Sequence, residues 1–285
     1  MKHGLFGDAQ FPPSSPFLLA DCHVHSRHSF DSSSTLDAIC AAALAAGIRE
    51  LCLTEHIEPH HRYLHCAVYP LFSDWLADIA RAREAFPGIT LLAGIEIGDN
   101  SPYRDEIYRT LDPLPLDFRL LSLHQIDNID PFDAAFYEGR TRREAYTRYV
   151  EAKLESVLHF ADYDAVAHLG YCGKFAPYPP EERPLRWRDA PDHIDLMLRH
   201  IARHGRALEI NTSGLRRIGS VIPGWDIIRR FAELGGEFVT LGSDSHAPDT
   251  LCHRFDDARR AAVSAGIRWG VRYAARKPMP YALDA

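Results

Sequence analysis

Segments with the composition of β-strands alternate with segments of helical periodicity along most of this chain. Eight stretches rich in apolar and β-branched residues are bounded by turn residues, at 17–24, 50–54, 89–97, 118–123, 164–167, 207–210, 238–241 and 268–273. Helical segments lie between them at 34–46, 73–86, 141–160, 192–204, 225–234 and 256–265, with capping patterns at Ser34 and Thr141. Such alternation indicates parallel strands joined by right-handed crossovers. For a chain of 285 residues we therefore predict one closed α/β barrel, a single domain spanning 1–285.

Two segments depart from this alternation. Residues 1–16 contain Pro12, Pro13 and Pro16, and we expect an irregular N-terminal arm that packs on the barrel or frays from it. Residues 172–191 contain five prolines. We expect this segment to be an ordered loop over the barrel mouth, with a linker as the alternative.

The composition, with 46% hydrophobic and 25% charged residues, is that of a globular protein. A net charge of −7 without a long basic run argues against a nucleic-acid surface. The first residues lack the apolar core of a signal peptide, and nowhere do about 18 apolar residues run together. We therefore expect a cytoplasmic protein that binds neither nucleic acid nor membrane, as a monomer or homodimer. Six scattered cysteines without a C-x-x-C pair indicate buried thiols, with disulfides or a zinc knuckle as alternatives.

Residues that can bind metal stand at the carboxyl ends of the predicted strands. His23 and His25 are two residues apart, so both imidazoles point to the same side of a strand. A lone His-x-His pair is as compatible with a metal-free surface, and a single polar strand end is more often a cap or a buried hydrogen-bonded group. Seven strand ends at one face of a barrel favour a metal site. They supply His23, His25, Glu55, His56, Glu96, His124, His168, Asn211, Asp244 and His246.

The chemistry of these candidate ligands narrows the choice of metal. Histidines and carboxylates without cysteine suit zinc, manganese or iron. Glu96 stands among apolar neighbours in Gly94-Ile95-Glu96-Ile97, where an unpaired carboxylate is costly to bury. Because two bound cations would compensate that cost, we predict that Glu96 is a bridging ligand.

The strand-end motifs resemble those of the polymerase and histidinol phosphatase (PHP) domain, a family of metal-dependent phosphoesterases. The matching pieces, in the family's order, are Asp21-x-His23-x-His25-Ser26-x-x-Ser29-x-Asp31, Thr54-Glu55-His56, Gly94-Ile95-Glu96, Ser122-Leu123-His124, Ala167-His168-Leu169 and Gly242-Ser243-Asp244-Ser245-His246. The resemblance implies a distorted (β/α)7 barrel that holds three divalent metal ions at the C-terminal ends of its strands.

Carried over by position, the resemblance also implies a ligand set for each ion. One ion would take His23, His25, Glu96 and Asp244, a second would share Glu96 and take His124 and His168, and the third would take Asp31, His56 and His246. Asp31 stands where some members have histidine, so the third site should be harder and prefer manganese or iron. We assign catalytic roles to Glu96, Asp244 and His246.

Substrate contacts are predicted around the sixth strand. The stretch Glu209-Ile210-Asn211-Thr212-Ser213-Gly214-Leu215-Arg216 resembles the histidinol-phosphatase branch of the family. Arg216 or Arg217 would clamp a phosphate as a planar fork, with a solvated arginine pair as the alternative. Lys174, Asn211 and His28 complete the predicted substrate contacts. Further candidates for contact with a substrate amine or imidazole are Glu55, His60, His61, His65, Tyr171 and Phe175, although a plain solvated loop is the alternative for each of the first four.

These features predict a metal-dependent phosphomonoesterase that acts on a small phosphorylated metabolite. A divalent metal cluster makes a metal-bridging hydroxide available for in-line attack on a phosphoryl group. The resemblance implies a histidinol-phosphate phosphatase, which converts L-histidinol phosphate and water to L-histidinol and phosphate in histidine biosynthesis. Two alternatives stay open: a PHP phosphoesterase acting on another small phosphate or a nucleotide, and a non-catalytic metal-binding domain.

Overall fold

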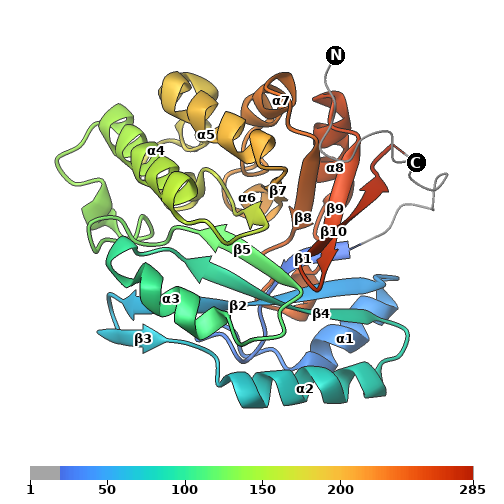
Figure 1. Cartoon of the computed structure of the whole chain (residues 1–285). Helices are drawn as coiled ribbons and strands as arrows, with labels where there is room; N and C mark the ends of the chain where they lie inside the picture. Colours follow the sequence, from blue (N-terminus) through green and yellow to red (C-terminus); the bar gives the residue numbers. More distant parts are fainter. Residues whose placement is uncertain (1–19, 285) are drawn as a thin grey trace.

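The computed structural model describes residues 20–284, which form one largely parallel sheet with helices outside it (Figure 1). The strands are β1 (Ala20–Val24), β2 (Glu50–His61), β3 (Cys66–Val68), β4 (Thr90–Gly98), β5 (Phe118–Ser122), β6 (Ala165–Val166), β7 (Ala207–Asn211), β8 (Phe238–Gly242), β9 (Trp269–Ala274) and β10 (Lys277–Ala282). The α-helices are α1 (Leu36–Ala45), α2 (Phe72–Ala85), α3 (Arg104–Leu111), α4 (Arg142–His159), α5 (Pro191–Arg203), α6 (Ser213–Arg217), α7 (Trp225–Glu233) and α8 (Phe255–Ser264). All eight predicted strands and all six predicted helices have a counterpart in this part of the chain.

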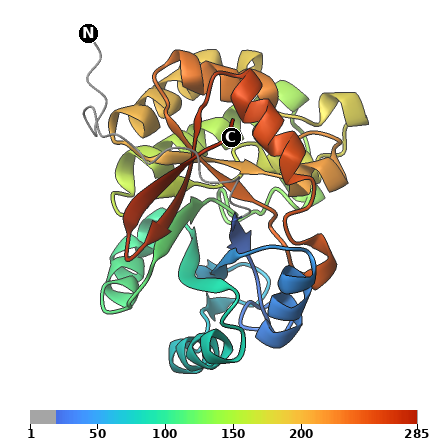
Figure 2. The ribbon, with the colours of Figure 1, turned by 90° about the vertical axis from the view of Figure 1, so that its right-hand side faces the viewer.

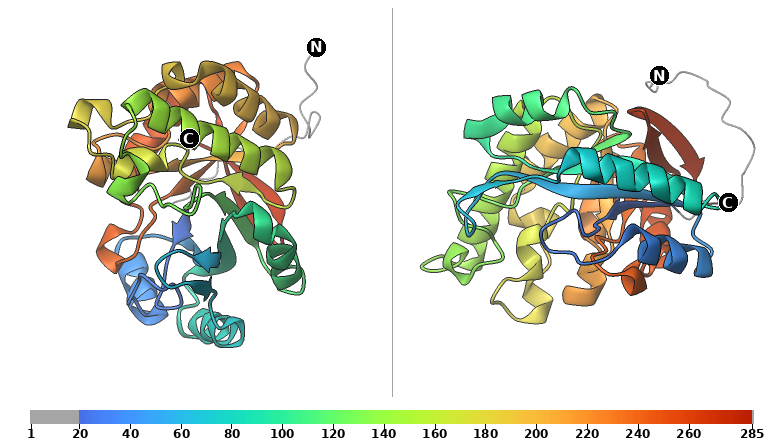
Figure 3. Two further views of the ribbon diagram at one scale, coloured as in Figure 1. Left: turned by 90° about the vertical axis from the view of Figure 1, so that its left-hand side faces the viewer. Right: turned by 90° about the horizontal axis from the view of Figure 1, so that it is seen from below.

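Seven parallel strands close into a barrel. β1, β2, β4, β5, β6, β7 and β8 pair in this order. A bridge between Val24 and Ser245 joins the end of β8 back to β1, and the backbone N–H of His25 donates to the Ser245 carbonyl at 2.8 Å. β6 has only two residues and the β1–β2 pairing contains a register shift, so the barrel is distorted, as predicted. Figures 2 and 3 show the helices around the outside of the strands.

Two apolar clusters hold these layers together. The larger cluster lies between the strands and the outer helices and includes the fully buried Trp75, Tyr146 and Phe231. The smaller cluster, with Phe118 and Leu120, fills the amino-terminal half of the barrel. Burial of apolar surface makes the main contribution to folding stability, and these two clusters supply it. The inward-facing residues at the carboxyl ends of the strands are not needed for that purpose, so they can be polar.

Several elements were not predicted from the sequence. β2 continues beyond Thr54 to His61 and pairs with β3 as an antiparallel arm. Its last residues, Glu-Pro-His-His, do not have a strand-like composition. The helices α3 and α6 and the antiparallel strand β10 were also missed. α1 is capped by Thr35, whose Oγ1 accepts from Ala38 N at 3.2 Å, and not by Ser34. The capping box of Thr141 and Glu144 is present as predicted.

Only the first residues of the segment 172–191 reach the mouth of the barrel, where Lys174 and Phe175 line the pocket. The remainder forms 3₁₀ turns that pack beside α4, and Arg142 of that helix binds Asp189 at 2.7 Å. The predicted arm at residues 1–16 lies outside the described residues. Among the described helices, none is long and apolar enough to span a membrane.

Candidate metal centre

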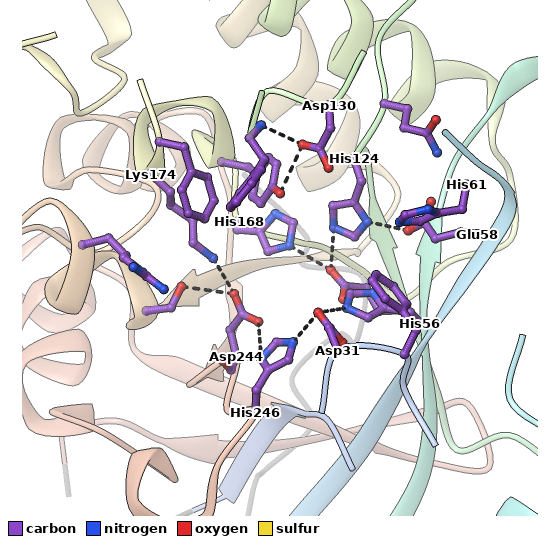
Figure 4. Close-up of a pocket in the computed structure, with 18 of the residues that line it drawn as sticks. Asp31, His56, Glu58, His61, His124, Asp130, His168, Lys174, Asp244 and His246 are labelled. Atoms are coloured by element: carbon purple, nitrogen blue, oxygen red, sulfur yellow. Dashed lines mark hydrogen bonds and ion pairs between the residues drawn. The ribbon is translucent and has the colours of Figure 1, made fainter. Parts of the chain in front are cut away.

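The carboxyl ends of the barrel strands surround a pocket of about 480 Å³, a size typical of small-molecule sites. Its floor is made of histidines and carboxylates (Figure 4). They are Asp31, His56, Glu96, His124, His168, Asp244 and His246. His23 and His25 are fully buried behind this floor. All nine residues predicted as metal ligands therefore lie in one place.

Glu96 of β4 is at the centre of this group. It is fully buried, and the parallel register of β2 and β4 sets it beside His56. Its two oxygens face different histidines: Oε2 lies 3.2 Å from His23 Nε2, 3.4 Å from His25 Nε2 and 3.1 Å from His56 Nδ1, whereas Oε1 lies 3.2 Å from His124 Nε2 and 2.8 Å from His168 Nε2. This division of contacts is the geometry that a bridging carboxylate needs.

The charge state of Glu96 is consistent with a metal ligand. Burial raises the pKa of its carboxyl, but His23, His124 and His56 lower it, and the net pKa is well below the usual range. Burial likewise disfavours the charged form of His23, yet Glu209, Glu96 and Asp244 raise its pKa well above the usual value. Glu96 is therefore ionised, and positive charge is stabilised around it.

Asp244, His246 and Asp31 form the edge of the centre nearest the mouth. His246 Nε2 lies 3.0 Å from Asp31 Oδ2, and His56 Nε2 lies 3.4 Å from the same oxygen. Asp244 Oδ1 lies 3.8 Å from His23 Nε2 and 3.7 Å from His25 Nε2. The loop after β1 and the end of β8 thus meet at this edge, although Asp31 and His246 are far apart in the sequence.

The donor set fits divalent metal ions. Four overlapping groups of three have ligand atoms within 4.8 Å of one another: His25, His56 and His246; His23, His168 and Asp244; His23, His25 and Glu96; and His56, Glu96 and His124. Within residues 20–284, Glu96 Oε2 and His56 Nδ1 are buried and lie 3.1 Å apart, yet neither atom makes a hydrogen bond. Buried polar atoms of this kind are costly unless something binds them, and a cation would do so.

Carboxylates behind the histidines orient the imidazole rings. Glu209 Oε1 lies 2.6 Å from His23 Nδ1, and Glu58 Oε1 lies 2.6 Å from His124 Nδ1. When each Nδ1 donates a proton outwards, the Nε2 lone pair points inwards, which is the usual arrangement around a protein-bound metal.

His25 is held in the same way through a hydroxyl. The Ser29 hydroxyl donates to Glu55 Oε2 at 2.6 Å and accepts from His25 Nδ1 at 3.1 Å. Glu55 also accepts from the Ser26 hydroxyl and is fully buried. The predicted contact of Glu55 with a substrate amine is therefore wrong, because this carboxylate holds the loop after β1.

Glu58 and Glu209 were not assigned a role from the sequence. Each packs where a glycine leaves room: a side chain at Gly98 would collide with the Glu58 carboxylate, and one at Gly242 would collide with Glu209 and His23. A glycine beside a ligand strand is a weak signal on its own, since only the paired strand shows what fills the space.

Two predicted substrate contacts are not supported by the structure. His28 lies outside the pocket, where its Nε2 is 3.1 Å from Asp78 Oδ2 of α2. Asn211 is fully buried, donates to Glu209 Oε2 at 3.2 Å and accepts from Ser213 N at 2.9 Å. Asn211 therefore positions the Glu209 carboxylate and the start of α6, and it does not face a substrate.

The three predicted cations do line the pocket. Lys174 Nζ lies 2.7 Å from Asp244 Oδ2. Arg216 donates to the Ser243 and Asp244 carbonyls at 3.2 and 3.3 Å, and the Arg217 guanidinium stands 5.7 Å from the Phe175 ring centre. Their positive charges lie along the side of the pocket nearest Asp244.

Replacement of Glu58 by glutamine should weaken metal binding without unfolding the protein. The neutral amide accepts a weaker hydrogen bond from His124 Nδ1 than the carboxylate does, so the ring is less firmly oriented and its Nε2 is a less basic ligand. Loss of such an outer partner costs about 10–100-fold in metal affinity or activity. Metal titration followed by activity should show a higher half-saturation concentration and a recovered maximum. Glu84→Gln on the exposed side of α2 is the control, and an unchanged titration of the Glu58 variant would contradict the orienting role.

Comparisons with known proteins agree with this geometry. Residues 21–213 match the PHP domain family. The chain is 30% identical over 249 residues to the histidinol-phosphatase of Lactococcus lactis subsp. lactis, covering 87% of this chain and 91% of that protein. It is 26% identical over 242 residues to the probable histidinol-phosphatase of Thermotoga maritima, covering 85% and 90% of the two chains.

Solved structures show the same likeness. The histidinol phosphate phosphatase of Lactococcus lactis, crystallised with zinc, L-histidinol and phosphate, superposes with a TM-score of 0.83 at 27% identity, covering 92% of this chain and 99% of that one. The hisK protein of Listeria monocytogenes has a TM-score of 0.69 at 18% identity over 84% of this chain and 99% of its own, and it supports the fold alone. With its motifs, barrel and pocket in agreement, this chain belongs to the PHP domain family.

Proposed function

We propose that this protein is a histidinol-phosphate phosphatase, which hydrolyses L-histidinol phosphate to L-histidinol and phosphate. The observation that carries the proposal is the site at the strand ends, where eight histidine and carboxylate side chains gather around Glu96 and three cationic side chains line the same pocket. The resemblance to the Lactococcus lactis enzyme, whose structure holds zinc, L-histidinol and phosphate, supports the choice of substrate.

In this proposal the nine residues hold three divalent metal ions, zinc, manganese or iron, divided as the family resemblance implies. Bound metals would supply a water of lowered pKa and neutralise phosphoryl oxygens. The chain itself supplies the rest of the chemistry. Arg216, Arg217 and Lys174 hold the phosphate, and the rings of Tyr171 and Phe175 line the pocket next to them. The catalytic roles of Glu96, Asp244 and His246, the single domain, the cytoplasmic location and the monomer or homodimer stay predictions.

A panel of phosphate esters tests the function. Phosphate release should be fastest with histidinol phosphate, compared with other amino-acid-derived monoesters, sugar phosphates and nucleotides, and the same sample should contain divalent metal. Turnover of other monoesters without histidinol phosphate would assign the protein to another phosphoesterase activity. Full metal content without any turnover would favour a metal-binding domain.

Removal of the Arg216 side chain should weaken substrate binding. A hydrogen bond to a charged group contributes about 1.5–3 kcal/mol, so Arg216→Ala should raise KM for histidinol phosphate about 10–100-fold. Steady-state kinetics measure the change, with Arg229→Ala on the exposed side of α7 as the control. An unchanged KM would contradict a phosphate contact of Arg216 and would indicate that Arg217 or Lys174 makes this contact.

A further inference from the structure

The pocket carries opposite charges on two sides. Lys174, Arg216 and Arg217 line one side, and Lys174 meets Asp244 there. Asp130, from the loop between β5 and α4, approaches the pocket from the side of His124 (Figure 4). A ligand that fills the pocket would therefore contact both a basic and an acidic region.

Asp130 differs from the other carboxylates that line the pocket, since it has no ion-pair partner within residues 20–284. Each of the others does: Asp31 with His246, Glu58 with His124, Glu96 with His168 and Asp244 with Lys174. Lys174 and the histidines of the metal centre are thus already paired, and Arg62, which also lines the pocket, donates to the Asn128 carbonyl at 2.9 Å. An ionised Asp130 carboxylate therefore has no paired positive charge among the described residues, and a cationic ligand would supply one.

The hydrogen bonds of the Asp130 carboxylate fix its position and leave one oxygen for a ligand. Its Oδ1 accepts from Phe132 N at 2.8 Å and from the Tyr171 hydroxyl at 3.3 Å. Both bonds reach the same oxygen, so within the described residues no donor occupies Oδ2. Burial raises the pKa of this carboxyl although its hydrogen bonds lower it, and a cation from a ligand would offset the cost of that burial.

We infer that Asp130 binds the ammonium group of an amino-alcohol phosphate and so selects substrates that carry a cation close to the ester. The inference rests on the proposed function and names the part of the substrate that this residue recognises. Tyr171 spans the two charged regions, because its hydroxyl donates to Asp130 while Lys174 Nζ lies 5.4 Å from its ring centre. A ligand whose phosphate meets Lys174 and whose ammonium meets Asp130 would therefore lie along Tyr171.

The test compares Asp130→Asn with the unmodified enzyme on three esters: histidinol phosphate, phosphoethanolamine and phenyl phosphate. At about pH 7.5 an aliphatic amine that is not next to a carbonyl group is mainly charged, while the substrate imidazole, with a pKa of about 6.5, is mainly neutral. We expect kcat/KM to fall about 10–100-fold for the two amino-alcohol phosphates, as for the loss of a charge-assisted hydrogen bond. Phenyl phosphate, which lacks an ammonium, should be hydrolysed as by the unmodified enzyme.

Asp133→Asn is the matched control. This carboxylate lies in the same loop, bonds to Tyr63 at 3.0 Å and does not line the pocket. It should leave the order of preference among the three esters unchanged. Metal content is measured in each variant, so that an altered metal centre is recognised.

An equal loss on all three esters would overturn the inference, since Asp130 would then only maintain the pocket. An unchanged kcat/KM for the amino-alcohol phosphates would overturn it as well. A second experiment compares histidinol phosphate with its des-amino analogue on the unmodified enzyme, and it does not depend on the folding of a variant. Equal turnover of the two esters would also contradict the inference. If histidinol phosphate is not hydrolysed at all, the proposed function fails, and phosphoethanolamine, as substrate or competitive inhibitor, still reports on Asp130.

Discussion

Replacement of Glu96 by glutamine is expected to remove bound metal together with phosphatase activity. Glutamine keeps the shape of the side chain, but it lacks the charge that both oxygens present to five histidines. Metal catalysis contributes several kcal/mol to the transition state, so kcat/KM should fall about a thousandfold or more. Elemental analysis and steady-state kinetics on the same sample measure both losses.

The outcome for metal distinguishes two roles of Glu96. Full metal content with low activity would contradict the bridging role and leave only a catalytic one. Full activity would refute both roles. Glu84→Gln, which changes an exposed glutamate on α2, should retain the metal content and activity of the unmodified protein.

Chelation is expected to abolish activity and to lower the melting temperature. A ligand present at a thousand times its dissociation constant stabilises the folded state by about 4 kcal/mol. In a chain of this length each kcal/mol corresponds to about 2–4 °C, so Tm should fall by roughly 10 °C. Thermal unfolding with and without chelator measures the shift, and readdition of zinc or manganese should restore both properties.

The Glu96→Gln protein provides the control for this experiment. If it has already lost its metal, the chelator should lower its melting temperature by much less than that of the unmodified protein. An equal shift in both proteins would show that the chelator acts elsewhere. Undiminished activity after chelation would contradict metal dependence altogether.

Much of the metal centre could be predicted because of its position on strands. His23 at the end of β1 and His25 just after it point to the same side through the two-residue period of a strand, and the carboxyl ends of parallel strands meet at one face of a barrel. The contacts of Glu96 with five histidines from four segments follow from these two rules. Asp31 lies in a loop and was placed only through the resemblance to the PHP domain.

Loop residues and outer contacts could not be predicted in this way. His28 follows the ligand histidines closely, yet it turns towards Asp78 on α2, 50 residues later in the sequence. Asn211 stands at a strand end like the ligands, but Glu209 and Ser213 occupy its polar atoms. The direction of a side chain in a loop or under a neighbouring strand depends on partners that are distant in the sequence. A local sequence pattern does not identify these partners.

By itself, the sequence determined the order of eight strands and six helices, the residue types at the strand ends and hence the chemistry of the pocket floor, because the periodicity of apolar residues is a local property. Only the tertiary structure decided which nitrogen of each histidine faces Glu96, that Glu58 and Glu209 support those rings, and that Asp130 and Lys174 line the same pocket as the metal centre. Glu209 is 186 residues from His23, and contacts over such separations are set by the closure of the barrel, which brings together segments that have no short-range relation.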